Sequence, residues 1–129
     1  MFIEYLSKEE KEVFFSLALE LVSVDDKFSQ DEKEKIKVLS LNTLGQDGYD
    51  EENLCNDLSK LDTFSKKKIV LTELIQLCYV DGVYCESEKV FIHNLAERLG
   101  VDEPTLLEIE NWVSGFVNQM NKGIKLINK

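Results

Sequence analysis

The sequence predicts an all-α protein, with a single domain over residues 1–129 that folds as a bundle of about six or seven helices. The first observation is an internal repeat, because a segment of apolar helix, acidic turn and second helix occurs twice at a shift of 56 residues. The second is a low content of turn-forming residues: one proline and six glycines are too few for many short strands and their turns. The third is a hydrophobic content of 43%, which is enough for one core.

The repeat predicts two superposable helical hairpins, at about residues 10–41 and 66–97, related by a pseudo-twofold axis. The equivalent positions are Leu21 and Leu77, Val24 and Val80, Asp25 and Asp81, Phe28 and Tyr84, and Glu32 and Glu88. We expect the two aromatic members, Phe28 and Tyr84, to point inward as apolar plugs that fasten the acidic turns to the core.

The first hairpin is defined by two capping boxes. Ser7 and Glu10 have the spacing with which a serine oxygen and a glutamate satisfy the first amides of a helix. The apolar stripe that follows ends near Asp25, and Ser29 and Glu32 then begin the second helix in the same way. Gly45 is expected to end that helix.

The second half of the chain predicts four more helices. A short one begins at residues 50–52 and runs through Leu61, and the next begins after Ser65 and is apolar on nearly all sides, which places it at the centre of the bundle. The helix after residues 81–82 ends at Gly100. The last begins at Asp102 and carries an apolar stripe to Met120. Trp112 belongs to that stripe and is predicted to lie in the core.

Composition excludes several classes of function. The net charge of −10 makes free nucleic acid an unsuitable partner, because phosphate binding requires a basic surface. No apolar run is long enough to span a membrane, and the N-terminus lacks the features of a signal peptide. Three cysteines, an odd number, favour a reducing compartment, so we expect a cytoplasmic protein.

The C-terminal tail, residues 122–129, has the opposite charge. It carries three lysines and no acid, so its charge is +3. Since the whole chain has a net charge of −10, residues 1–121 carry −13. Two interpretations remain: the tail is a frayed final turn, or its lysines and apolar side chains contact an anionic surface.

Reactive motifs are not found in the sequence. It contains no glycine-rich phosphate loop and no Cys/His ligand spacing, and no nucleophile–base pair can be named, so we expect a protein that is not an enzyme. A lone imidazole makes a poor metal site, and we therefore expect His93 to be structural.

The acidic turns are the candidate site. If the two hairpins pack about a twofold axis, Asp25, Glu32, Asp81 and Glu88 converge at one end of the bundle, where they can hold Ca²⁺ or another hard divalent cation. The alternative is that Glu32 and Glu88 are capping-box residues, since each lies three residues after a helix-capping position, and that the aspartates only end helices.

At these turns the chain resembles the TerB-like family, named for bacterial tellurite-resistance proteins. The resemblance rests on the doubled pattern of apolar helix, acidic turn, aromatic residue and helix-opening glutamate, best seen at residues 80–88, and on residues 94–101 that follow. The first copy departs from it, with Asp26 where glycine is usual.

This resemblance implies an all-helical bundle with internal symmetry, acidic residues suspected of binding metal, and no established enzyme activity. It also implies assembly with other stress-response proteins at the inner face of a membrane. A related domain occurs in a membrane-anchored DnaJ-type co-chaperone. The alternative function is a metal-independent protein-interaction adaptor, or a co-chaperone-like module, that recruits a partner through an acidic face.

Overall fold

The protein is all-α. The computed structural model describes the chain except residues 1, 25–29, 46–47, 49, 51–52 and 81–82, and the side chains of residues 30–32 and 80. The described residues form five α-helices, two one-turn 3₁₀ helices and no strand. In chain order these are η1 (Ile3–Tyr5), α1 (Lys8–Ser23), α2 (Gln30–Leu44), η2 (Leu58–Lys60), α3 (Phe64–Val80), α4 (Glu86–Leu99) and α5 (Glu103–Ile127).

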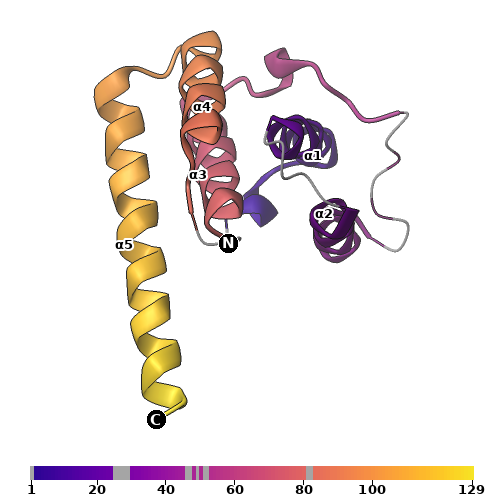
Figure 1. Ribbon diagram of the computed structural model, residues 1–129. Helices are drawn as coiled ribbons and strands as arrows, with labels where there is room; N and C mark the ends of the chain where they lie inside the picture. Colours follow the sequence, from indigo (N-terminus) through magenta and orange to yellow (C-terminus); the bar gives the residue numbers. More distant parts are fainter. Residues whose placement is uncertain (1, 25–29, 46–47, 49, 51–52, 81–82) are drawn as a thin grey trace.

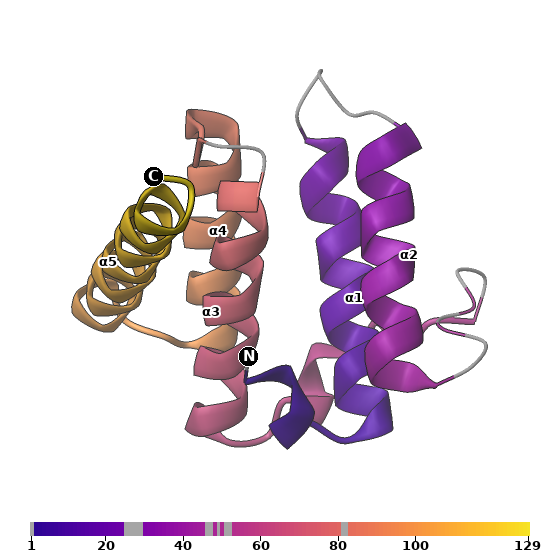
Figure 2. The ribbon, with the colours of Figure 1, turned by 90° about the horizontal axis from the view of Figure 1, so that it is seen from below.

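The helices pack in consecutive antiparallel pairs. Helix α1 lies beside α2, and α3 lies beside α4, while α5 packs along α3 and also contacts α4 (Figures 1 and 2). Helix α1 also contacts α3 and so joins the first pair to the rest of the molecule. The helix expected at the centre is therefore α3, and this expectation is confirmed: Val70, Leu71, Leu74 and Ile75 are fully buried on it.

Two buried acids connect the helices. Glu10 completes the predicted capping box of α1, accepting from the Ser7 amide at 2.7 Å, and pairs with Lys66 of α3 at 2.6 Å. Burial works against its ionisation, but Lys66 and the Ser7 bonds together outweigh it and hold the pKa of Glu10 below its usual value. Glu73 of α3 accepts from the Phe2 amide at 2.6 Å and thereby holds the N-terminal segment on the bundle.

The predicted count of about six or seven helices is not confirmed. The short helix expected from residues 50–52 through Leu61 is not formed in the described part of that segment, which contains only the single turn η2. The leucines still serve the core, with Leu61 buried and Leu54 and Leu58 packed against it. A segment of this length has too few turns to form a stable helix unless packing supports it along its whole length.

Of the two interpretations of the tail, the frayed final turn does not agree with the structure, because α5 continues to Ile127 and covers most of residues 122–129. One expectation about α5 is wrong. Trp112 is 46% exposed and stacks on Phe116, with ring centroids 5.5 Å apart, instead of lying in the core. In the described part of the chain, none of the helices is sufficiently long and apolar to cross a membrane.

Candidate functional site

Three of the four predicted cation ligands cannot be placed. Asp25 and Asp81 lie outside the described residues, as does the side chain of Glu32, and the same holds for the predicted plug Phe28. In the part of the chain that is described, no group of three His, Cys, Asp or Glu side chains is arranged to hold a metal ion. The four-carboxylate site therefore stays a prediction.

The fourth residue, Glu88, is engaged as a helix cap. Its Oε1 accepts from the backbone amide of Cys85 at 2.9 Å, the capping-box contact that the alternative interpretation predicted. The carboxylate also lies beside the buried thiol of Cys78, whose pKa is raised by burial and by Glu88. Glu88 thus stabilises the start of α4, and Cys78 is a protonated core residue with no nucleophilic character.

The two helix pairs present equivalent ends on the same side of the molecule. Helices α1 and α3 run in the same direction, and α2 and α4 both run back, as Figure 2 shows. The C-terminal ends of α1 and α3 therefore point the same way, which is the arrangement that a shared site between the two hairpin turns requires.

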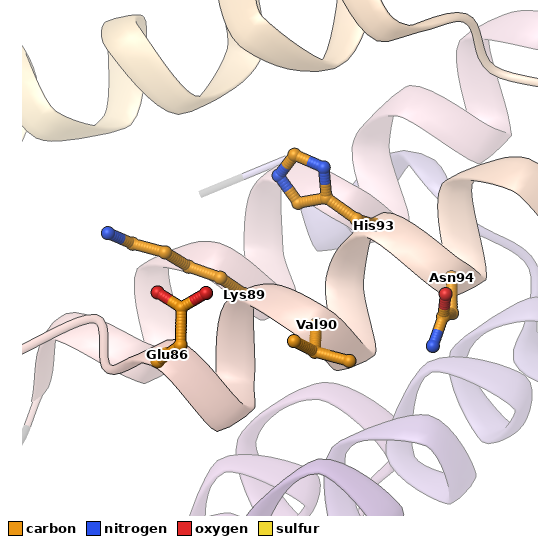
Figure 3. A pocket seen from close by; sticks show the side chains of 5 residues that line it. All are labelled: Glu86, Lys89, Val90, His93 and Asn94. Carbon is orange, nitrogen blue, oxygen red and sulfur yellow. The ribbon is translucent and has the colours of Figure 1, made fainter.

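A polar network joins α4 to α5. Glu110 of α5 accepts a hydrogen bond through Oε2 from the hydroxyl of Tyr84 at 2.8 Å, and Nε2 of His93 lies 3.1 Å from the same oxygen. The other ring nitrogen of His93 is 3.4 Å from Glu103, in the first turn of α5. Figure 3 shows the His93 ring directed from α4 toward the neighbouring helix.

Tyr84 is the buried member of this network, and its predicted role as an inward plug is confirmed. The residue is 7% exposed, its ring packs against Tyr79, and the ammonium of Lys89 lies 5.6 Å from the ring centroid. Burial and the bond to Glu110 raise the pKa of its hydroxyl, so Tyr84 is a proton donor and not a base at neutral pH. The network is suited to fixing α5 on α4.

A shallow hollow lies next to His93. It has a volume of about 390 Å³ and is lined by Glu86, Lys89, Val90, His93 and Asn94, all on α4 (Figure 3). Ligand sites of this volume are normally enclosed clefts with convergent polar groups. Here all the lining residues belong to one helix, and Figure 3 shows Val90 and Asn94 directed away from Lys89 and His93, so the hollow lacks convergent chemistry.

Most of the exposed large apolar residues of α5 lie in its C-terminal part, which we call the α5 tip (residues 118–129). Figure 1 shows α5 running well past the ends of α3 and α4. Met120, Ile124 and Ile127 are 53%, 50% and 84% exposed, and they lie three or four residues apart on one side of the helix. Lys122, Lys125 and Lys129 surround Leu126 on the other side.

The chain matches no family model, no curated protein and no solved structure.

The polar network was not predicted from the sequence, whereas residues 122–129 of the tip were already a candidate contact surface through their lysines and apolar side chains. Glu110 lies beside Ile109 and one turn from Leu106 and Val113, and an acid at the edge of an apolar stripe indicates a buried polar partner. The signal for the tip was the continuation of the same stripe past Met120 into the lysine-rich segment. Neither signal identifies the partner, because that depends on which helices pack together.

Proposed function

We propose that this protein is a non-enzymatic binding module that docks another protein on the apolar side of the α5 tip. The observation that carries this proposal is the exposure of Met120, Ile124 and Ile127 in one row on a helix that extends beyond the bundle. Exposed apolar groups that form a contiguous row on a regular element are characteristic of interaction sites, whereas single exposed ones are common on any surface.

The helical state of the tip supports a docking role. Single helices of three or four turns are marginally stable in water and take most of their stability from packing of an apolar face. The tip also contains Gly123, Asn118 and Asn121, residues with low helix propensity. A partner that covers the exposed row would supply the missing stabilisation. This resembles helix-in-groove recognition, in which an amphipathic helix places its apolar face in a groove of the partner.

The biological setting is proposed from the TerB-like resemblance: a cytoplasmic module of a tellurite or related stress response. Two consecutive antiparallel helix pairs, α1–α2 and α3–α4, agree with the helical repeat on which that resemblance rests. We further propose that the pairs are related by the pseudo-twofold axis and that their backbones superpose. An experimental structure in which the pairs cannot be overlaid would refute the symmetry.

Site-specific photo-crosslinking tests the docking role. A photoreactive amino acid replaces Ile124 in the producing cell, and as a control it replaces Val38, which is 56% exposed on α2. The proposal predicts a discrete protein adduct from position 124 and none from position 38. Equal labelling at both positions, or none at position 124, would contradict it.

A second candidate function is binding of a hard divalent cation by Asp25, Glu32, Asp81 and Glu88. The shared direction of the α1 and α3 ends favours it, since carboxylates brought together at one end of the bundle repel one another until a cation neutralises them. Against it, Glu88 is already engaged as a cap, which makes partner docking the first choice.

Calorimetric titration with Ca²⁺, Mg²⁺ and Zn²⁺ tests the cation site. The double variant Asp81→Asn, Glu88→Gln should lose binding, and the control Glu97→Gln, on the exposed side of α4, should keep it. The absence of binding to the parent below millimolar cation, or equal binding by the double variant, would exclude the site.

A further inference from the structure

The apolar row of the tip is the continuation of a row that the protein itself buries. Along α5, Leu106 and Val113 are buried in the core, Ile109 and Val117 are partly buried against it, and the same side of the helix then carries Met120, Ile124 and Ile127. With 3.6 residues per turn these positions form one stripe down the whole helix. The first half of the stripe is covered by α3, and α3 does not reach the second half (Figure 1).

What covers the second half must therefore resemble a helix in the position of α3. The second half of the stripe is narrow and consists of an unbranched methionine and two β-branched isoleucines, spaced by three and four residues as in helix–helix seams. A helix whose apolar residues have the same spacing can pack against this row. The tip of a second copy has that spacing because its sequence is the same.

Charge selects a second copy over a lipid surface. The tip carries +3 and residues 1–121 carry −13, so the lysine-bearing end of a tip that lies antiparallel to a second tip is directed toward the acidic body of that second molecule. The same −13 would be repelled by an anionic membrane. The three lysines gather around Leu126 on the side away from the apolar row, so two tips can pack row to row with their like charges facing outward.

We infer that the α5 tips of two copies pack against each other in antiparallel orientation and make a symmetric dimer. Met120 of one copy then lies opposite Ile127 of the other, and Ile124 lies near the twofold axis, because the contact is the same patch on both molecules. The inference rests on the proposed docking role of the tip and names its occupant.

Sedimentation velocity of the purified full chain, from micromolar to near-millimolar concentration, tests the dimer. The matched variants are Ile124→Asp, in the apolar row, and Leu126→Asp, which places the same charge on the lysine side of the same turn. We expect the parent and Leu126→Asp to reach the mass of two chains, and Ile124→Asp to remain at the mass of one. Circular dichroism of each variant confirms that the helical bundle is retained.

Three results would overturn the dimer. The parent stays at the mass of one chain at all concentrations, or both aspartate variants lose the dimer equally, or monomers of the parent bind phosphatidylserine vesicles through the tip. The crosslinking at position 124 separates these failures from that of the docking role. A discrete adduct with a different protein, found with a monomeric parent, refutes the dimer alone, whereas the absence of any adduct refutes the docking role as well.

Discussion

The two halves of α5 have the same apolar periodicity and opposite environments. In residues 103–117 the stripe is buried, with Leu106 1% and Val113 0% exposed, whereas in the tip Ile124 is 50% exposed. The first half carries Glu103, Glu108 and Glu110, and residues 111–129 contain no acid. Periodicity thus reports that a helix has an apolar face, and the length of the neighbouring helices decides whether the same chain covers it.

Truncating one apolar residue in each half should give the largest difference. Leu106→Ala removes a fully buried side chain and is expected to lower the free energy of unfolding by about 2–5 kcal/mol. Ile124→Ala, measured at a concentration where the protein is monomeric, should change it by less than about 0.5 kcal/mol. Urea unfolding of both variants checks the comparison. Similar losses for both would show that the tip is packed within its own chain.

The polar network should account for the next largest effect, since it exists only in the first half of α5. Glu110→Ala removes the acceptor of both Tyr84 and His93, and the partly buried groups that remain should cost about 1–3 kcal/mol. Glu108→Ala, exposed on the same helix, is the control and should be nearly neutral. Equal effects on thermal unfolding would mean that the network does not hold α5 on α4.

The network also predicts a dependence on alkaline pH. The pKa of Tyr84 is raised in the folded state, first by burial and then by Glu110, so the stabilisation is complete below the unfolded pKa of about 10 and is lost as pH rises above it. Tyr84→Phe should lose about 0.5–1.5 kcal/mol at pH 7 and should show a shallower decline above pH 10 than the parent. Tyr5→Phe, at an exposed tyrosine, should follow the parent. An unchanged alkaline slope in Tyr84→Phe would contradict the assignment.

The smallest expected difference between the two halves of α5 concerns a glycine in each half. A Cβ added at Gly115 or at Gly123 would meet no atom within 4 Å, so neither Ala variant is hindered. Gly115→Ala should raise the free energy of global unfolding by about 0.4–1 kcal/mol. Gly123→Ala should raise helicity with a smaller gain, because the exposed tip contributes little to the packing that global unfolding disrupts. Equal gains would show that α5 unfolds as one unit.

Local chemistry made much of the fold predictable. Ser7 and Glu10, and Asp102 before Pro104, begin helices where their side chains satisfy the first amides, and Gly45 and Gly100 follow helix ends with positive φ angles. The central position of α3 could be predicted because its own apolar residues occur on nearly all sides of the helix. The segment through Leu54, Leu58 and Leu61 was misread, since leucines that pack against a core from an irregular chain have the same spacing as those on a short helix.

The site was less predictable for a physical reason. Tyr84, His93 and Glu110 come from parts of the chain that only the packing of α4 on α5 brings together, and no local rule fixes that pairing. The role of Glu88 could be predicted from local sequence, because it lies three residues after Cys85, and the capping alternative for it is confirmed. Trp112 was expected in the core from its stripe, but it lies at the side of the stripe, where it stacks on Phe116.

Amide hydrogen exchange along α5, at low and high protein concentration, tests the pairing of the tips most directly. Pairing predicts that protection of residues 118–127 rises with concentration, while protection of residues 106–117 stays constant. The Ile124→Asp variant should lose the concentration dependence, and Leu126→Asp should keep it. Fast exchange in the tip at every concentration, or protection that is already complete in the monomer, would contradict the claim that a second copy covers the apolar row of the tip.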